Sequence, residues 1–373
     1  MTGTMSSFSL RRTDFQHLPG WEDDDPSGLP AGMRSCLDHV RCVKPYKTGA
    51  LGLSSYDILP IYEAAAGAAF TGASAARQFF ETHFQPFEIC RENGDAGFVT
   101  GFYEPEIAVS SAPSAAFSHP FYRRPSDLVE LQDANRPPSL DASYAFGLFR
   151  DGVTGQYADR RQIDCGYLEG RGLEIAWARS KVDVFFAHIQ GAARLRFPNG
   201  ALKRITYAAK SGHPFSAIGK LLIERGAIDP ATVSMQSIRT WLSQNPAKVD
   251  EVLWHNRSYI FFREAEVEDA ELGPVAAAKV PLLPGRSLAV DKLVHTFGFP
   301  FFVHAPTLTQ LDDGEPFART LLALDTGSAI IGAARGDIFT GSGDAAGERA
   351  GIIRHEADFY ILVPKSVAGR FER

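Results

Sequence analysis

Hydrophobic and polar positions along the chain predict more strands than helices. Short apolar runs rich in β-branched and aromatic residues are typical of strands; they occupy residues 97–109, 201–207, 258–262, 299–303, 319–324 and 359–363. Helical patterning is clearest in three segments, 61–84, 213–225 and 231–244. Many short strands favour barrels or sandwiches over a parallel sheet with alternating helices.

Two of the predicted helices have recognisable end signals. Asp229 and Pro230 precede 231–244, and a capping residue followed by proline is a common helix start. Gly226 follows 213–225 and suits the left-handed backbone that often ends a helix. The Ala- and Phe-rich segment 61–84 is predicted as one helix.

Composition is that of a globular protein with an acidic balance. The 373 residues are 45% hydrophobic and 22% charged, which allows two or more domains with apolar cores. The formal net charge is -6 and the chain has no block of Lys and Arg. Because phosphate binding depends on concentrated basic surface, nucleic acid is not expected as a partner.

The cysteines and the first residues of the chain say little about the type of site or the location of the protein. The four cysteines form no CxxC pair, so their spacing indicates no metal or redox site. We expect buried free thiols, although the spacing leaves disulfides open. The first 25 residues contain neither the apolar core of a signal peptide nor a lipid-attachment cysteine. Either the protein stays in the cytoplasm or its export signal is missing from this sequence.

Potentially catalytic residues are most concentrated between residues 319 and 351. An apolar strand ends in Asp325, glycine-rich turns follow, and a second short strand starts with Asp337. Two carboxylates at strand ends could converge on a cleft where the backbone approaches a ligand closely. Spacing alone, however, favours the interpretation that both aspartates are turn formers that accept hydrogen bonds from their own backbone.

Other catalytic motifs fit this region poorly. Residues 323–328 resemble an aspartic protease strand, but no second D-T-G or D-S-G supplies the other aspartate. Residues 341–347 have GxGxxxG spacing and no Walker lysine. The chain contains no HExxH, no His/Cys cluster at ligand spacing and no G-x-S-x-G, so neither a metal nor a serine nucleophile is expected.

Ordered motifs along nearly the whole chain resemble the membrane-bound lytic murein transglycosylase A family. The tail resembles the family's 3D domain, with three aspartates in SLAVD at 287–291, DTGSAI at 325–330 and GDIFTG at 336–341. Further family-like blocks are LPGW at 18–21, FVTGFYEP at 98–105, PFYR at 120–123, FFAHIQG at 185–191, SMQSIRTWL at 234–242 and NRSYIFF at 256–262.

The chain also departs from the family pattern. Ala192 and Ala193 replace the S-G of Q-G-S-G, and Ser328 replaces the second glycine of D-x-G-G. These changes affect details of the sugar subsites. The missing export signal is the larger departure, because the family acts in the periplasm and is usually lipid-anchored to the outer membrane.

The resemblance implies a mainly β fold with some α structure. It would comprise a double-psi β-barrel catalytic domain from residues 1–105 and 256–373, with the 3D domain at about 280–365. A second β-barrel, residues 106–255, would be inserted, with a substrate groove between the two. Under this resemblance Asp337 is catalytic and Asp325 supports it. Asp291 is structural, capping a turn.

The resemblance also raises Thr100, Tyr103 and Gln190 to sugar-binding candidates. Without it, Tyr103 could be a core aromatic and Gln190 could satisfy buried backbone. The implied ligand is a peptidoglycan glycan strand, with proteins of cell-wall synthesis complexes as further partners. The protein is expected to be a monomer and to need no cofactor.

The implied reaction is lytic transglycosylation, in which one aspartate acts first as acid and then as base. The 6-hydroxyl of N-acetylmuramic acid attacks its own anomeric carbon and closes a 1,6-anhydro ring. The acid must start protonated, so its pKa must be raised by desolvation or by a neighbouring carboxylate such as Asp325. Two alternatives stay open: a non-catalytic polysaccharide-binding protein on the same barrel, and a hydrolase using both aspartates.

Overall fold

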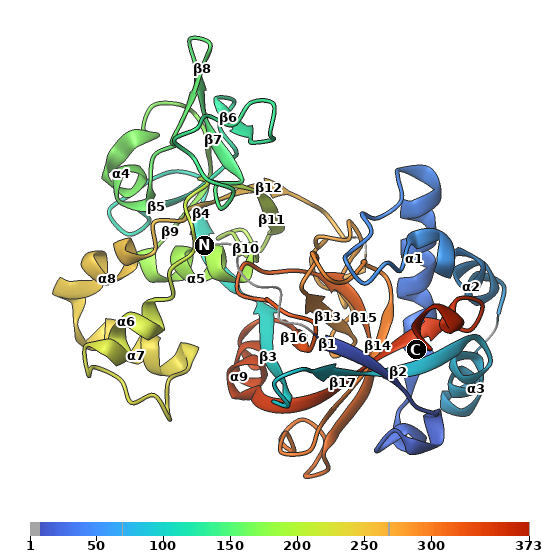
Figure 1. Cartoon of the computed structure of the whole chain (residues 1–373). Helices are drawn as coiled ribbons and strands as arrows, with labels where there is room; N and C mark the ends of the chain where they lie inside the picture. Colours follow the sequence, from blue (N-terminus) through green and yellow to red (C-terminus); the bar gives the residue numbers. More distant parts are fainter. Residues whose placement is uncertain (1–7, 69, 268, 373) are drawn as a thin grey trace. The chain divides into compact units, whose positions relative to one another are not determined.

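A computed structural model describes residues 8–68, 70–267 and 269–372, and the chain divides into two compact units (Figure 1). Unit 1 combines the ends of the chain, Met1–Tyr103 and Val267–Arg373, and unit 2 is Glu104–Glu266. The second boundary lies beyond residue 255, the position expected from the sequence, because the strand at Ile260–Glu264 pairs inside the sheet of unit 2. The assignment of these units to functional domains stays a prediction.

Unit 1 is built on one mixed sheet. Its strand order is β1-β2-β17-β14-β15-β13-β16-β3, and β3 also pairs with β17. Within the described residues this second pairing closes β17, β14, β15, β13, β16 and β3 into a ring, which leaves no free edge among them. The strands are β1 (Phe8–Arg12), β2 (Phe84–Arg91), β3 (Gly97–Glu104), β13 (Ser287–Val290), β14 (Pro300–Ala305), β15 (Phe317–Asp325), β16 (Arg335–Ser342) and β17 (Arg354–Pro364).

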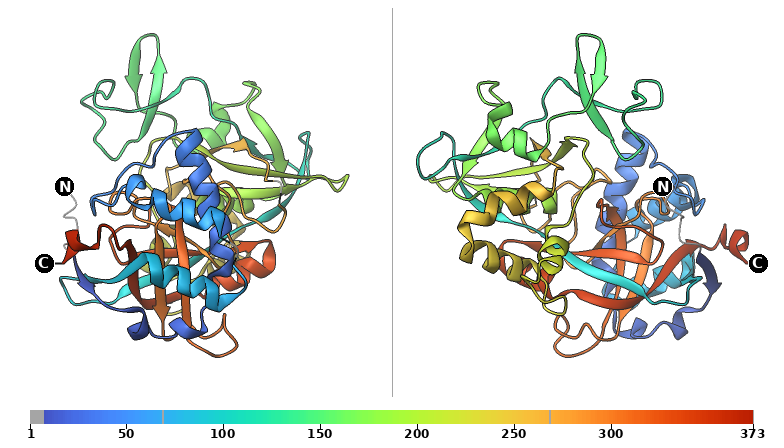
Figure 2. Two further views of the ribbon diagram at one scale, coloured as in Figure 1. Left: turned by 90° about the vertical axis from the view of Figure 1, so that its right-hand side faces the viewer. Right: turned by 60° about the vertical axis from the view of Figure 1, so that its left-hand side comes forward.

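Helices cover this sheet on two sides (Figures 1 and 2). The group α1 (Leu29–Cys42), α2 (Ser55–Gly67) and α3 (Ala73–His83) lies on one side, and α9 (Asp344–Ile352) lies against β16. The buried faces of strands and helices form a continuous apolar core that includes Phe301, Leu322 and Phe339, each fully buried. Burial of this surface stabilises the strands from which the candidate carboxylates project.

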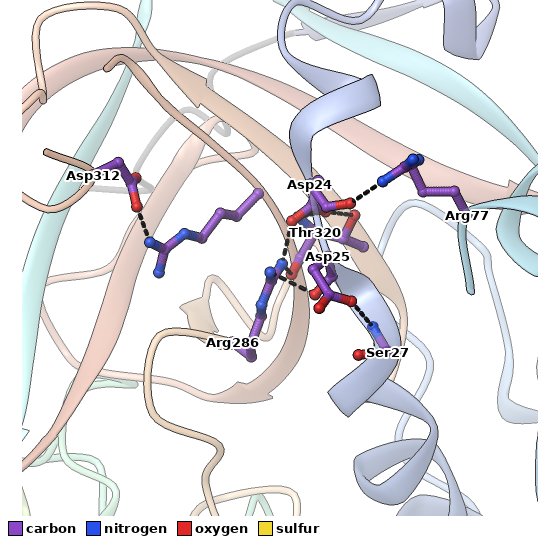
Figure 3. Close-up of polar contacts among 8 residues, drawn as sticks. Asp24, Asp25, Ser27, Arg77, Arg286, Asp312 and Thr320 are labelled. Atoms are coloured by element: carbon purple, nitrogen blue, oxygen red, sulfur yellow. Dashed lines mark hydrogen bonds and ion pairs between the residues drawn. The ribbon is translucent and has the colours of Figure 1, made fainter. Parts of the chain in front are cut away.

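A buried carboxylate ties the N-terminal segment to two strands of unit 1 (Figure 3). Asp24 accepts hydrogen bonds from the Thr320 backbone nitrogen at 2.8 Å and the Thr320 hydroxyl at 2.6 Å. The Arg286 guanidinium donates to the same carboxylate at 2.6 Å. Thr320 lies in β15 and Arg286 directly precedes β13, so this contact fixes the two strands that lead to the candidate site.

Unit 2 contains a second mixed sheet, a small hairpin sheet and a group of helices. The larger sheet has the order β12 (Ile260–Glu264), β11 (Leu202–Lys210), β10 (Ala192–Arg196), β4 (Glu106–Ser110), β9 (Glu174–Ala178) and β5 (His119–Tyr122). The smaller sheet is β6 (Leu128–Glu130), β7 (Phe146–Arg150) and β8 (Val153–Gly155). The helices are α4 (Arg160–Gln162), α5 (Lys181–Gln190), α6 (Ile218–Glu224), α7 (Met235–Gln244) and α8 (Val249–His255).

The predicted helices are present but their bounds were partly wrong. The segment 61–84 is two helices, because Ala68 is extended and Gly72 has φ +113°, outside the helical region. Helix α6 starts only at Ile218, because the residue before it, Ala217, has extended backbone (φ -73°, ψ 117°). Helix α7 is capped by Ser234, whose side chain accepts from the Ser237 backbone nitrogen, and not by Asp229.

Two further sequence-based predictions need correction. The predicted strand 97–109 is interrupted between β3 and β4 at Pro105, since proline has no N–H for the ladder. Among the described residues all four cysteines have free thiols, but only Cys36 is buried. Cys42 and Cys165 are exposed, so the expectation of buried thiols was wrong for them. The overall prediction of a β-rich fold with some α structure is confirmed.

Candidate active site

Strand register brings Asp325 and Asp337 to either side of one short strand. In the parallel β13–β15 pair Ala289 is opposite Asp325, and in the antiparallel β13–β16 pair it is opposite Asp337. Adjacent strands lie about 4.7–4.9 Å apart, so roughly 9–10 Å separates the two aspartate backbones. Both side chains are partly exposed, and the site is therefore a pair of carboxylates near one end of β13.

Asp337 is held by a short chain of hydrogen bonds. The Thr100 hydroxyl of β3 donates to Asp337 Oδ1 at 2.6 Å. Arg335 Nη2 donates to Thr100 Oγ1 at 2.7 Å, so the single hydroxyl proton of Thr100 is left for the carboxylate. Arg335 and Asp337 are two residues apart on β16 and project to the same face of the strand.

Asp325 accepts hydrogen bonds from main-chain groups. The Ala277 backbone nitrogen donates to Asp325 Oδ1 at 3.2 Å, and the adjoining Ala278 nitrogen donates to the Leu324 carbonyl at 3.0 Å. These bonds attach the 276–280 turn to the end of β15. Lys279 in this turn has φ +65°, an uncommon conformation for a lysine.

Burial raises the pKa of both carboxyl groups to about 6. For Asp337, burial outweighs the opposing effects of the Arg335 charge and the Thr100 hydrogen bond. For Asp325, burial is again the largest cause, while the Thr326 and Ala277 backbone N–H groups lower the pKa and the Asp337 charge raises it. A carboxyl with a pKa near 6 exchanges protons readily near neutral pH, as general acid–base catalysis requires.

Asp291 is buried and bonds to two loops. Its Oδ1 accepts from the Leu293 backbone nitrogen at 2.9 Å, and its Oδ2 accepts from the Gly332 backbone nitrogen at 2.8 Å. Its own carbonyl accepts from the backbone nitrogens of Val294 and His295. Asp291 thus caps the turn after β13 and fixes the loop that joins β15 to β16.

The remaining sugar-binding candidates lie in different surroundings. Tyr103 is 7% exposed, and its ring packs so closely on α9 that a Cβ at Gly347 would come within 2.8 Å of it. Gln190 is the last residue of α5 in unit 2 and precedes Gly191, which ends the helix with φ +76°. The sugar contacts of Thr100, Tyr103 and Gln190 stay predictions.

Sequence reasoning missed two contributors to this site. Arg335 could have been found, since a basic residue two positions before Asp337 on a strand shares its face. The Ala277 backbone nitrogen left no signal, because any residue except proline would provide it. Among the described residues no group of three His, Cys, Asp or Glu could hold a metal ion.

Comparison with known proteins gives the family. Residues 98–263 match the MltA specific insert domain, and residues 286–363 match the 3D domain. Membrane-bound lytic murein transglycosylase A of Escherichia coli (strain K12) is 30% identical over 274 residues, which cover 72% of this chain and 66% of that protein. The matched region thus spans just under two thirds of that relative.

Similar solved structures indicate the same family. The crystal structure of membrane-bound lytic murein transglycosylase from Agrobacterium tumefaciens has 59% identity and a TM-score of 0.93, with 98% of this chain and 100% of that chain covered. MltA from Neisseria gonorrhoeae in its monoclinic form has 29% identity and a TM-score of 0.77, with 97% and 95% covered. The chain therefore belongs to the membrane-bound lytic murein transglycosylase A family, as the motifs indicated.

Proposed function

We propose that this protein cleaves the β-1,4 bond between N-acetylmuramic acid and N-acetylglucosamine in peptidoglycan as a lytic transglycosylase. The observation that carries the proposal is Asp337, a partly exposed carboxyl with a pKa raised to about 6. Asp337 is oriented by the Thr100 hydroxyl and, through it, by Arg335. Membership in the family supports this reaction class.

The hydrogen bonds assign separate roles to the two oxygens of Asp337. Because Oδ1 accepts the Thr100 proton, the acidic proton belongs on Oδ2. Oδ2 gives this proton to the glycosidic oxygen as the bond to the anomeric carbon breaks. The 6-hydroxyl of the same N-acetylmuramic acid then attacks that carbon and returns its proton to Oδ2. The products are a free N-acetylglucosamine end and a 1,6-anhydro-N-acetylmuramic acid end, and no water is consumed.

In this mechanism Asp325 supports Asp337 electrostatically. The two carboxyl groups, on either side of Ala289, interact, since the Asp337 charge raises the pKa of Asp325; an ionised Asp325 in turn disfavours ionisation of Asp337. A hydrolase would instead need Asp325 to attack the sugar or activate water. Asp325 Oδ1 accepts the Ala277 N–H, a bond that leaves Oδ2 for chemistry, so the products and not this contact distinguish a hydrolase from a transglycosylase.

The proposal also covers the cellular location of the protein and the roles of its two units. The relatives are named membrane-bound, and we place the activity in the periplasm, at the outer membrane. No helix in the described part of the chain is long and apolar enough to cross a membrane. We assign unit 1 to a double-psi barrel that carries the acid, and unit 2 to the inserted barrel that contributes Gln190 to glycan binding.

The test is mass spectrometry of the products released from purified sacculi. Transglycosylation yields 1,6-anhydro ends, which are lighter by one water than the reducing ends left by a hydrolase. A non-catalytic binding protein would retain glycan and release no fragments. Reducing ends alone, or no fragments, would contradict the proposal.

A further inference from the structure

Two exposed aliphatic side chains lie on the loops that begin at the candidate site. Ile331 is 75% exposed and belongs to the loop 326–334 that joins Asp325 to the strand of Asp337. Leu293 is 66% exposed and lies in the turn after β13, the strand between those two aspartates. Isolated exposed aliphatic residues are common on proteins. Leu293 and Ile331, however, both lie in loops that directly follow strands of the candidate site.

The Asp291 carboxylate holds these two loops together. Its oxygens bond the Leu293 nitrogen at 2.9 Å and the Gly332 nitrogen, next to Ile331, at 2.8 Å. On each loop the adjoining aliphatic residue is buried: Ile330 is 5% exposed and Val294 is 4% exposed. The inner side chains thus anchor the loops in the core while Leu293 and Ile331 face solvent.

The glycan proposed above has few groups that would gain from an aliphatic surface. Its hydroxyl, ether and amide groups are polar, whereas each sugar carries the methyl of an acetamido group. We infer that Leu293 and Ile331, positioned by Asp291, form an apolar rim of the substrate site that binds acetamido methyl groups next to the reacting bond. This inference rests on the proposed function and adds specificity-determining residues to it.

The experiment compares strands that differ only in that methyl. Glycan strands are de-N-acetylated chemically and then either re-acetylated or formylated, which keeps the amide and removes the methyl. Burying one methyl-sized group contributes enough free energy for about a three- to fourfold change in affinity. Leu293→Ser/Ile331→Ser should raise KM on acetylated strands about three- to tenfold and leave kcat unchanged. On formylated strands, the same variant should match the wild type.

Two further variants act as controls. Val43→Ser removes an aliphatic side chain of similar exposure, 67%, at the end of α1, and it should leave KM unchanged on both substrates. Asp291→Asn replaces one acceptor oxygen with a donor and loosens the loops. It should reduce the preference for acetylated over formylated strands, a ratio that partial unfolding alone would not change.

The inference is overturned if the double variant keeps the wild-type preference for acetylated strands, or loses activity equally on both substrates. That result leaves the proposed function intact, because the wild type would still form anhydro ends. A wild-type enzyme that forms no anhydro ends from either substrate would overturn the proposed function and, with it, the inference.

Discussion

Asp337 is the residue on which the proposed chemistry depends. Asp337→Asn keeps the size of the side chain but removes the group that donates and recovers a proton. Loss of acid–base catalysis lowers turnover by about 10²–10⁴-fold, and we expect at least this loss because no second carboxylate shares the task. Release of anhydro fragments from sacculi measures turnover, and sedimentation with sacculi measures binding.

Glycan binding should survive in Asp337→Asn, because the amide still fits beside Thr100. Asp133→Asn, which changes an exposed carboxylate of unit 2, is the matched control and should behave as wild type. Anhydro products at a near wild-type rate from Asp337→Asn would rule out Asp337 as the acid.

The neighbouring carboxylate should be visible in the pH dependence of the reaction. Activity needs protonated Asp337, so it should fall as the pH rises through the pKa of about 6. Two like charges raise each other's pKa; in Asp325→Asn the falling limb of the kcat profile should therefore move to lower pH. Identical profiles for wild type and Asp325→Asn would remove the supporting role from Asp325.

Strands β13 and β15 depend on a contact far from the reaction. The Asp24 carboxylate is buried and binds Arg286 and Thr320 (Figure 3). Asp24→Ala leaves the guanidinium without this partner, and breaking a buried pair from one side costs about 3–5 kcal/mol. We expect a loss of this order in the free energy of unfolding of unit 1.

Trp21 reports on this unfolding because it is the tryptophan of unit 1, while Trp177, Trp241 and Trp254 lie in unit 2. Urea denaturation would follow its fluorescence after the other three are replaced by phenylalanine. Asp25→Ala is the neighbouring control: Asp25 is exposed and caps the Ser27 nitrogen at 3.0 Å, so its loss should cost only about 0.5–1 kcal/mol. Equal losses from both variants would contradict the role of Asp24.

Local sequence patterns predicted the presence of helices and strands better than they predicted where each element ends or which distant residues it contacts. The short apolar run in 319–324 found β15, because a strand that is buried on both faces is continuously apolar. The helix break near Gly72 was missed, since the surrounding Ala and Phe residues fit a helix equally well. The contact of Asp24 with Thr320 spans 296 positions, and no local pattern reports a partner at that distance.

For the whole molecule, family motifs identified the candidate acid but not its surroundings. Asp325 and Asp337 were predicted from motif positions, whereas their placement across Ala289 follows from a parallel pairing of β13 with β15. Such pairing depends on the closed sheet and not on the nearby sequence. The Thr100 contact with Asp337 spans 237 positions, and its role in orienting the acid emerged only from the fold.

The raised pKa of Asp337 also predicts how the stability of the whole protein depends on pH. In the folded state this pKa is about 6, against an ordinary value of 3.8. The folded protein therefore binds the proton more tightly than the unfolded chain, and the resulting stability is complete below about pH 4 and is lost as pH rises through 6. Asp337→Asn cannot ionise, so it should be more stable than wild type at pH 8.

A shift of two pKa units corresponds to at most about 3 kcal/mol, and the partial solvent exposure of the carboxyl reduces this to on the order of 1 kcal/mol. Thermal unfolding at pH 8 and pH 4 measures the effect: Asp337→Asn should have the higher Tm at pH 8, and the difference should vanish at pH 4. Asp133→Asn controls for the loss of one negative charge and should match the wild type at both pH values. A Tm difference of the same size at pH 4 and pH 8 would show that Asn improves packing at this position. A Tm below wild type at pH 8 would show that the ionised carboxylate stabilises the fold, which is incompatible with an acid kept protonated by burial.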